Sequence, residues 1–357
     1  MRVLILGGNF DHAGGTERVG SMLANGLSEA GYEIVLSSVS QGDKPFFALN
    51  KEIKVVSLFK ATGRGLYHTP TLIYKIRKLL QEEDIDTLIV VESMLVLFTL
   101  PAITGLPVKH ICWEHFNFNN DLGKKGRRVA RQLAARYCDS VVTLTERDKE
   151  YWLKSTRHKS QIISIANPCP FPVQYYDKNA DTKIVLAAGR LTYQKGFDLL
   201  LESWLQVNKV MPDWKLKIVG EGIDRAKLAE FIEKNQLTDV VELIGNTCKM
   251  SKYYQQAEIF CLSSRFEGFG MVLIEALAFG LPIVSFDCEV GPAEILEGTG
   301  SILVPQDDTN QLALSLVELM RDSERREDIS KQSKLKAEIY QPKNIINQWV
   351  ELLESSK

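Results

Sequence analysis

Residues 263–282 read SSRFEGFGMVLIEALAFGLP, and the rest of the chain is arranged around them. The run before them, residues 258–262, is mostly apolar and predicts a buried parallel strand. A sharp turn and a helix over about residues 269–279 follow. Gly280 and Pro282 are typical of the point where such a helix ends. The stretch therefore predicts the strand–turn–helix unit of an α/β protein.

The predicted helix begins among two glycines and two carboxylates. Gly268 and Gly270 let the backbone approach a ligand, and the unpaired N–H groups of a helix start favour a phosphate. Glu267 and Glu275 are eight residues apart in the sequence, which places them roughly 80° apart around a helix and about two turns apart along it. The residues alone allow two interpretations. Either they are a capping acid and a surface acid of an ordinary helix, or they hold different parts of one elongated ligand.

The composition indicates a two-domain globular protein. The chain has 357 residues, which is too long for one typical core. Its hydrophobic content of 45% and charged content of 25% are ordinary for a soluble protein. Residues 1–170 carry 22 Lys and Arg against 17 Asp and Glu, whereas the remainder carries 21 against 28. The basic first half predicts an anionic partner, and no nucleic-acid partner is predicted.

Cysteine usage and hydropathy indicate the compartment. The six cysteines show no C-x-x-C pair and no metal-ligand spacing, so we expect free thiols in a reducing environment. The first residues, MRVLILGG, predict a strand and a glycine turn and not a signal peptide. The most apolar region, residues 85–100, contains Asp86 and Glu92 and is too short to span a bilayer. We therefore expect a cytoplasmic protein with at most surface contact to the inner face of the cell membrane.

The first half begins as a strand–helix–strand unit. An apolar strand over residues 2–6 leads through glycines to a helix with Thr16 as its expected N-cap, and a second strand covers residues 32–37. No G-x-G-x-x-G follows the first strand, so a nicotinamide enzyme is not predicted. Gly14 and Gly15 either make only the turn, or admit a phosphate or an acceptor.

Two further segments of the first half carry polar groups. His115 follows an expected strand, at the strand end where ligands bind in open α/β sheets, although a lone histidine is also typical of a structural residue. Residues 123–136, GKKGRRVARQLAAR, predict a basic helix. Val129, Leu133 and Tyr137 are expected to face inward, with the Lys and Arg side chains outward. That basic face is either only solvated, or binds anionic lipid headgroups or an acceptor diphosphate.

A proline-rich connector predicts the domain boundary. Prolines 168, 170 and 172 forbid regular strand pairing and stiffen the chain. We therefore expect a first domain over residues 1–168 and a second over residues 169–341, with a separate final helix over residues 342–357.

The second half restarts the alternating pattern. A strand over residues 183–188 is followed by GRLTYQKGFD at residues 189–198. Arg190 and Lys195 fall in this strand-to-helix loop. A forked guanidinium and a compact ammonium together suit a diphosphate, although two loop cations are also typical of a solvated surface.

Five motifs resemble those of the retaining glycosyltransferases of family 4, and they spread over nearly the whole chain. They are the G-G-[AT]-E-R loop at residues 14–18, the E-H strand end at 114–115, the N-[PG] hinge at 167–168, G-R-L-x-x-x-K-G-x-D at 189–198 and E-x7-E at 267–275. The resemblance implies the GT-B fold, in which two Rossmann-like α/β domains face each other across a cleft. It also implies that the final helix packs back on the first domain.

The resemblance further implies a role for each matched residue. Arg190 and Lys195 would bind the donor diphosphate, and Glu275 would hold the ribose hydroxyls. Glu267 and His115 would hold the transferred sugar, so the expected catalytic set is His115, Glu267, Arg190 and Lys195. The other residues expected to bind the donor are Gly14, Gly15, Gly220, Ile244, Gly268, Phe269, Gly270, Met271 and Val272.

The implied reaction is transfer of a hexose or N-acetylhexosamine from a UDP-sugar to a glycan hydroxyl with retention at the anomeric carbon. The implied acceptor is an undecaprenyl-diphosphate-linked or soluble glycan, as in bacterial polysaccharide or lipopolysaccharide biosynthesis. No metal or other cofactor is expected, because fixed cations can meet the charge of the leaving diphosphate. Two alternatives stay open: a UDP-sugar epimerase on the same fold, and a non-catalytic subunit that binds a partner. Residue identity does not choose among GalNAc, Gal, Glc and GlcNAc.

Overall fold

The structure is a computed structural model, and it describes residues 1–60, 69–121, 123–175 and 182–355. The chain divides into two compact units. Unit 1 comprises Met1–Pro168 together with Pro342–Lys357, and unit 2 comprises Cys169–Gln341. Each unit is a parallel sheet covered by helices, so the expectation of two Rossmann-like α/β domains is confirmed.

Unit 1 contains a seven-stranded parallel sheet. Its strands are β1 Arg2–Gly7, β2 Glu33–Ser38, β3 Lys54–Ser57, β4 Thr87–Val91, β5 Lys109–Trp113, β6 Ser140–Thr143 and β7 Gln161–Ser164. Their order across the sheet is β3-β2-β1-β4-β5-β6-β7. Strands β4 and β5 are buried along their whole length, because helices cover both faces of a parallel sheet.

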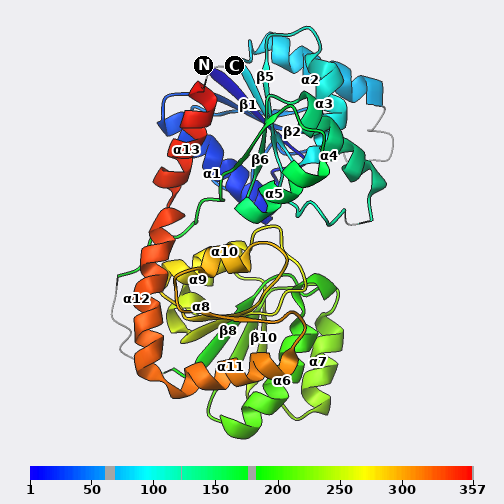
Figure 1. Ribbon diagram of the computed structural model, residues 1–357. Coiled ribbons are helices and arrows are strands. Elements are labelled where there is room, and N and C mark those ends of the chain that lie inside the picture. Colours follow the sequence, from blue (N-terminus) through cyan, green and yellow to red (C-terminus); the bar gives the residue numbers. More distant parts are fainter. Residues whose placement is uncertain (61–68, 122, 176–181, 356–357) are drawn as a thin grey trace. The chain divides into compact units, whose positions relative to one another are not determined.

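The helices of unit 1 lie on both sides of this sheet (Figure 1). They are α1 Gly15–Glu29, α2 Thr69–Glu82, α3 Val96–Ile103, α4 Lys125–Tyr137, α5 Glu146–Ser155 and α13 Pro342–Glu354, with a 3-10 turn at Ser93–Leu95 before α3. Helix α13 packs beside α1, and it buries apolar side chains at helical spacing, including Ile345, Trp349 and Leu352. Lys109 donates to the carbonyl of Leu352 (2.6 Å) and so caps the C-terminal end of α13.

Two sequence expectations about helices of unit 1 are wrong. The N-cap of helix α1 is Gly14, two residues before the expected Thr16, which lies inside the helix. On helix α4, only one of the three residues expected to face inward does so, because Leu133 alone of them packs against the core. Val129 and Tyr137 are exposed, whereas Arg127 and Arg131 are almost fully buried. The apolar periodicity misled because each buried arginine has a carboxylate partner that its own helix does not supply.

Unit 2 contains a six-stranded parallel sheet. Its strands are β8 Ile184–Ala188, β9 Lys215–Val219, β10 Val241–Gly245, β11 Ile259–Leu262, β12 Ile283–Phe286 and β13 Ile302–Val304, in the order β10-β9-β8-β11-β12-β13. Its helices are α6 Phe197–Val210, α7 Arg225–Lys234, α8 Met250–Gln256, α9 Met271–Ala278, α10 Pro292–Leu296, α11 Thr309–Arg321 and α12 Ser323–Ile339.

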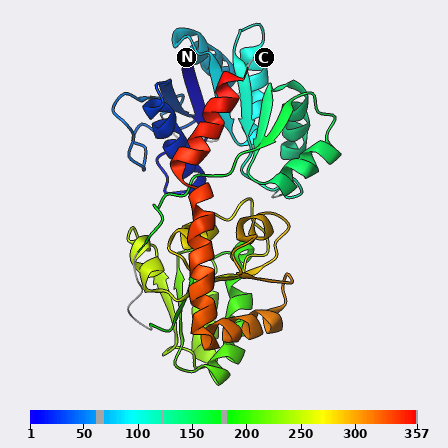
Figure 2. The same cartoon turned by 60° about the vertical axis from the view of Figure 1, so that its left-hand side comes forward.

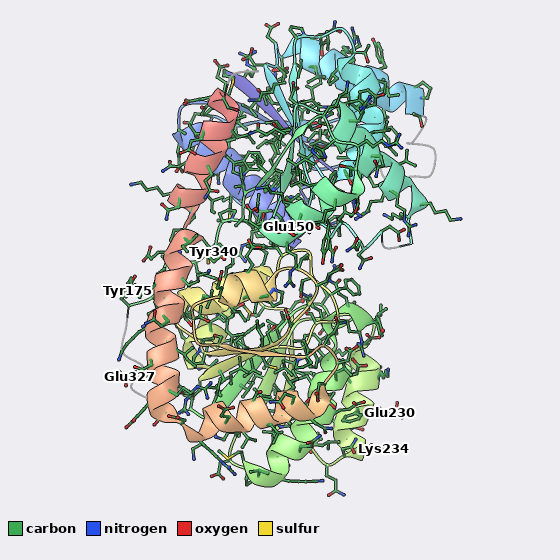
Figure 3. All side chains as sticks on the ribbon, in the orientation of Figure 1. Glu150, Tyr175, Glu230, Lys234, Glu327 and Tyr340 are labelled. Carbon is green, nitrogen blue, oxygen red and sulfur yellow. The ribbon has the colours of Figure 1, made fainter. Side chains whose placement is uncertain are left out.

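Helix α12 runs along one side of unit 2 and packs on α9 (Figure 2). At its C-terminal end the ring of Tyr340 meets Phe269 edge-to-face, with 6.0 Å between the ring centroids. Figure 3 labels Tyr175 beside the same helix, where its hydroxyl donates to Glu338 (2.7 Å). Phe269, two residues before α9, is therefore packed against the end of a long helix of its own unit.

Each sheet has one point at which the strand order reverses direction. In unit 1 it lies between β1 and β4, and in unit 2 between β8 and β11. In open α/β sheets, ligands bind outside the carboxyl ends of the strands at this switch point, where the two connections leave on opposite faces. The fold thus marks one ligand-binding edge in each unit.

Two observations bear on the expected environment of the chain. All six cysteines are free thiols, and Cys248 alone among them is exposed. Within the described part of the chain, no helix combines the length and the hydropathy needed to cross a bilayer.

Candidate active site

The switch point of unit 2 carries a buried ion pair. Lys195 follows β8 in a 3-10 turn, and Glu267 follows β11. The Nζ atom of Lys195 lies 2.6 Å from Oε1 of Glu267, and the Ser264 hydroxyl donates to the same oxygen at 2.6 Å. The Lys195 and Glu267 side chains are 15% and 6% exposed. The two residues that the sequence placed in separate motifs therefore form one fixed charged unit at the sheet edge.

Asp198, the last residue of the GRLTYQKGFD segment, also connects the loops after β8 and β11. Asp198 forms a two-bonded pair with Arg265, with distances of 2.9 and 2.8 Å. Arg265 donates in addition to the carbonyl of Tyr193 (2.8 Å), and its backbone N–H donates to Gln194 (2.8 Å). Such paired guanidinium–carboxylate contacts fix geometry. They hold Lys195 in register with Glu267.

Gly196 is required by this loop-to-loop contact. Its φ is +60°, and a Cβ atom there would lie 2.0 Å from the carbonyl oxygen of Ser263. Only a glycine satisfies both conditions, because other residues disfavour this backbone and would clash. The Ser263 hydroxyl donates to the carbonyl of Lys195 (2.9 Å), which closes the contact.

Helix α9 begins at the same edge. Its N-cap is Gly270, with φ +103°, so the sequence prediction of a glycine-bounded helix start holds. Gly268, Met271 and Val272 are half-buried around this start, whereas Phe269 is buried. The unpaired N–H groups of a helix start favour an anion.

Glu275 lies inside α9 and is not a surface acid. It is 6% exposed, and the Tyr254 hydroxyl donates to its Oε2 at 2.8 Å. Of the two interpretations that the sequence allowed, a solvated Glu275 on an ordinary helix is therefore wrong. A buried carboxylate is costly unless hydrogen bonds or charges compensate it, and such a group needs a structural or functional reason.

Arg190 contrasts with Lys195. It lies two residues beyond β8, and its exposed side chain makes no hydrogen bond or ion pair with the described residues. Its guanidinium is therefore available to an anionic ligand at the carboxyl end of β8.

Gly220 and Ile244 lie at the neighbouring strand ends. Gly220 pairs with Gly245 across an isolated bridge, and a Cβ atom on Gly220 would lie 1.9 Å from the carbonyl oxygen of Gly189. The contact between strand ends already requires glycine at position 220. Ile244 is half-buried in β10.

His115 belongs to unit 1, directly beyond β5. Its ring contacts Trp113, with 4.4 Å between the centroids, and Trp113 in turn meets Trp349 of α13 at 5.0 Å. Burial lowers the pKa of His115 to about 3, so the imidazole is neutral near pH 7. Its Nε2 atom is buried and has no hydrogen-bond partner among the described residues.

A buried carboxylate fixes the start of the loop that bears His115. Glu114 accepts from the N–H groups of His115 (3.1 Å) and Phe116 (3.2 Å) through Oε1. Its Oε2 accepts from the hydroxyl of Ser93 (2.5 Å) and from Nε of Arg131 (3.1 Å). Glu114 and Arg131 have side chains 0% and 1% exposed.

Arg131 also holds the remainder of this loop. Its guanidinium donates to the carbonyl oxygens of Phe118, Asn117 (3.0 Å), Asn120 (3.3 Å) and Phe116 (3.5 Å). One side chain thereby satisfies carbonyl groups that would otherwise be buried without partners. The loop after His115 is built around a single cation.

Gly14 and Gly15 lie where the chain leaves the switch point of unit 1. Gly14 caps α1 without a side chain, and a Cβ atom there would lie 2.0 Å from the Glu17 carboxylate. Gly15 is exposed, and no atom lies within 4 Å of the position that a Cβ atom would take on it. Because the φ of Gly14 is −96° and the Glu17 side chain is flexible, neither glycine is required by the backbone or by packing.

The predicted site residues therefore fall into two groups. Unit 2 brings Arg190, Lys195, Glu267, Glu275 and the start of α9 to one sheet edge. Unit 1 contributes His115, Gly14 and Gly15 at the carboxyl edge of its own sheet.

Sequence reasoning missed the polar residues that support this arrangement: Glu92, Glu114, Arg127, Arg131 and Tyr254. One signal was present. Acids at two adjacent strand ends and two arginines four residues apart on one helix could have been paired, because i and i+4 positions share a helix face.

Comparison with known proteins identifies the family of the chain. The family model for group 1 glycosyl transferases matches residues 173–336, and that for glycosyltransferase family 4 matches residues 13–169. The chain is 36% identical to an uncharacterized glycosyltransferase of Haemophilus influenzae, over 97% of this chain and 98% of the relative.

Two further relatives and a solved structure carry more specific names. An amylovoran biosynthesis glycosyltransferase of Erwinia amylovora is 30% identical over 99% of both chains. An N-acetyl-D-galactosaminyltransferase of Campylobacter jejuni, which acts on a diphospho-undecaprenol-linked glycan, is 28% identical over 97% of this chain and 96% of its own. Sucrose-phosphate synthase from Thermosynechococcus elongatus shares the fold, with a TM-score of 0.85 at 17% identity over 99% and 98% of the chains.

The two parallel-sheet units and these matches define a glycosyltransferase with the GT-B fold. The chain belongs to glycosyltransferase family 4, and it is an enzyme of the hexosyltransferase class.

Proposed function

We propose that this enzyme transfers a hexose or N-acetylhexosamine from a UDP-sugar to a hydroxyl of a glycan, with retention at the anomeric carbon. The observation that carries the proposal is the Lys195–Glu267 pair beside the exposed Arg190, at the switch point of unit 2. That edge offers two cations for a diphosphate and one oriented carboxylate for sugar hydroxyls.

The charge of the leaving nucleotide determines the roles of these groups. When the bond between the sugar and the diphosphate breaks, negative charge develops on the diphosphate oxygens. Lys195 and the N-terminal end of α9 would stabilise that charge without reorganising, because their positions are fixed before the reaction, and the exposed Arg190 guanidinium would add a second cation. No metal ion or other cofactor is needed in this scheme.

The two glutamates would orient the donor. Glu267, held by Lys195 and Ser264, would accept hydrogen bonds from sugar hydroxyls. Glu275, oriented by Tyr254, would do the same for the ribose. The neutral imidazole of His115 would contact an oxygen of the transferred sugar. The acceptor hydroxyl would attack the anomeric carbon from the face that the diphosphate leaves and pass its proton to an oxygen of the leaving diphosphate, which would give retention with no protein nucleophile.

A thermal-shift screen with UDP-, GDP- and ADP-sugars tests the donor. A ligand that binds only the folded enzyme raises the melting temperature by mass action, so UDP-sugars should stand out. Lys195→Ala and Glu267→Ala should then release UDP far more slowly than wild type in the presence of an acceptor. Equal release rates would contradict a catalytic role for this pair.

The product distinguishes transfer from the alternatives. NMR of the product should show the anomeric configuration of the donor. Conversion of the UDP-sugar without any acceptor would instead indicate an epimerase, and binding of UDP-sugars without turnover would indicate a non-catalytic subunit.

We further propose a lipid-linked glycan as acceptor, in the biosynthesis of a bacterial polysaccharide. The names of the relatives from E. amylovora and C. jejuni support this class. The outward face of α4 would contact the anionic membrane surface, since Lys124, Lys125 and Arg128 are exposed beside Val129 and Tyr137. Arg127 is buried and does not belong to that face.

Vesicle binding tests this contact. Replacing Lys124, Lys125 and Arg128 by Gln should weaken sedimentation with phosphatidylglycerol vesicles and leave the low binding to phosphatidylcholine vesicles unchanged. The matched control replaces three exposed cations elsewhere in unit 1, namely Lys51, Lys154 and Arg157. Equal binding by both triple variants would contradict a specific role for α4.

A further inference from the structure

Glu92 lies at the switch point of unit 1. It follows β4 directly, and its backbone N–H donates to the carbonyl of Trp113 (2.8 Å) at the end of β5. The strand order reverses between β1 and β4, so the crevice expected for a ligand of this unit opens at the same edge. The residues proposed to bind the donor at the switch point of unit 2 leave open which ligand binds in the crevice of unit 1.

The backbone of Glu92 is strained. Its φ and ψ are +85° and +132°, a region that residues with a Cβ atom rarely adopt and that costs about 1–3 kcal/mol. A glycine would take this conformation at no steric cost. Replacing Glu92 by glycine would relieve this strain. That the position nevertheless holds a glutamate indicates that its side chain is needed there.

A buried cation fixes the Glu92 side chain. Its Oε1 atom accepts from Nη2 of Arg127, which is 1% exposed and whose guanidinium stacks on the Phe116 ring at 4.1 Å from the centroid. The Nε and Nη1 atoms of Arg127 have no hydrogen-bond partner among the described residues. Glu92 is thus the carboxylate that compensates a buried charge, and the pair cannot separate cheaply.

The second carboxylate oxygen of Glu92 is not engaged in the same way. Oε2 accepts no hydrogen bond from the described residues, and the Glu92 side chain is 29% exposed, whereas that of Arg127 is 1% exposed. The pair therefore presents one immobilised, accessible acceptor atom at the carboxyl edge of the sheet.

We infer that Glu92 binds the acceptor, by accepting a hydrogen bond from a hydroxyl of the sugar unit that receives the transferred sugar. A hydrogen bond to a fixed carboxylate is charge-assisted and directional, which suits recognition of a sugar hydroxyl. Arg127 is a positioning residue that acts through Glu92. This inference rests on the proposed glycosyl transfer.

The test is steady-state transfer from the UDP-sugar to p-nitrophenyl hexosides and N-acetylhexosaminides. Glu92→Gln keeps the shape of the side chain and removes its charge. It should lower the acceptor kcat/KM roughly 10- to 100-fold, mainly through KM, as expected for loss of a hydrogen bond to a charged group. The stabilisation by UDP in a thermal-shift assay should match that of wild type. The acceptor kcat/KM of Glu92→Asp should lie between those of wild type and Glu92→Gln. This second variant replaces Glu92→Gln in the test if that protein does not fold.

Glu33→Gln is the matched control. Glu33 forms a carboxylate–guanidinium pair with Arg2 (2.6 Å) that is more exposed than the Glu92–Arg127 pair, at the first residue of β2 and so at the opposite edge of the same sheet. The Glu33→Gln variant should show the acceptor kcat/KM of wild type. An acceptor KM for Glu92→Gln equal to that of Glu33→Gln would overturn the inference, and so would a parallel loss of UDP stabilisation. If wild type transfers from no UDP-sugar to any of these probes, the proposed function itself fails, and the inference fails with it.

Discussion

The ammonium of Lys195 and the carboxylate of Glu267 form one buried unit, with 2.6 Å between Nζ and Oε1, although 72 residues separate them in the chain. Each residue neutralises the other in a place where an isolated charge would be costly. The contact also spans the two strands at which the sheet order reverses. It therefore links the stability of unit 2 to the edge where a donor would bind.

Lys195→Ala should cost both stability and activity. Removing one member of a buried pair leaves the other uncompensated, which is expected to cost about 3–5 kcal/mol of unfolding free energy. Urea unfolding measures the loss, and UDP release measures activity. Lys154→Ala, which breaks the exposed pair with Glu150 labelled in Figure 3, should unfold and turn over like wild type. Similar losses in both variants would contradict the special position of Lys195.

Arg131→Met should destabilise unit 1 and loosen the loop after His115. Glu114 would remain buried without its cation, and several loop carbonyls would lose their donor, so about 3–5 kcal/mol is expected. Hydrogen exchange of the amides of residues 115–120 should become faster.

Arg128→Met provides the comparison on the same helix. Arg128 is 77% exposed and paired with Asp121, so its loss should change neither unfolding nor exchange noticeably. Slow exchange of residues 115–120 in the Arg131 variant would show that other contacts suffice to hold the loop.

Gly196→Ala should be destabilising by more than about 1–2 kcal/mol, which is the cost of the left-handed backbone alone. The added methyl group would also meet the Ser263 carbonyl oxygen at 2.0 Å and push the two loops apart. UDP stabilisation in a thermal-shift assay should fall as well. Gly8→Ala is the control, because no atom lies within 4 Å of its Cβ position. A wild-type response of the Gly196 variant would show that the loops move independently.

His115 should make stability depend on pH. Burial lowers the pKa of His115 to about 3 in the folded state, against about 6.5 in the unfolded chain. Its contribution is therefore complete above pH 6.5 and is lost as the pH falls toward 3. Between pH 7.5 and pH 5.0, wild type should lose about 2 kcal/mol more than His115→Gln in urea unfolding. Exposed His158→Gln should follow wild type, and equal losses in all three proteins would contradict a buried neutral imidazole.

Local sequence patterns were sufficient for most of the fold. Apolar runs bounded by glycines gave the strands of both sheets, because strands buried on both faces must be continuously apolar. The prolines at 168, 170 and 172 marked the connector, and the two units meet in sequence at Pro168 and Cys169. The donor-side motifs also lay at strand ends, where an α/β sheet places its ligands.

The supporting side chains could not be read from the same patterns. Apolar spacing put Val129 and Tyr137 inward on α4, yet Arg127 and Arg131 are the buried residues. Their partners, Glu92 and Glu114, lie on other strand ends, so the sign of the energy for burying an arginine depends on groups that are distant in sequence. Likewise, the sequence allows Glu275 to be a surface acid, and only the folded structure shows that Tyr254 donates a hydrogen bond to it.

The amino-acid sequence alone was enough to establish the α/β class, the two-part layout and the presence of residue types that suit a diphosphate, since these follow from periodicity and spacing within short segments. The pairing of Lys195 with Glu267, of Arg131 with Glu114 and of Arg127 with Glu92 emerged only in the folded chain. The physical reason is that a buried charge is stable only beside its counter-charge, and sheet order, which brings the two together, is a property of the whole unit.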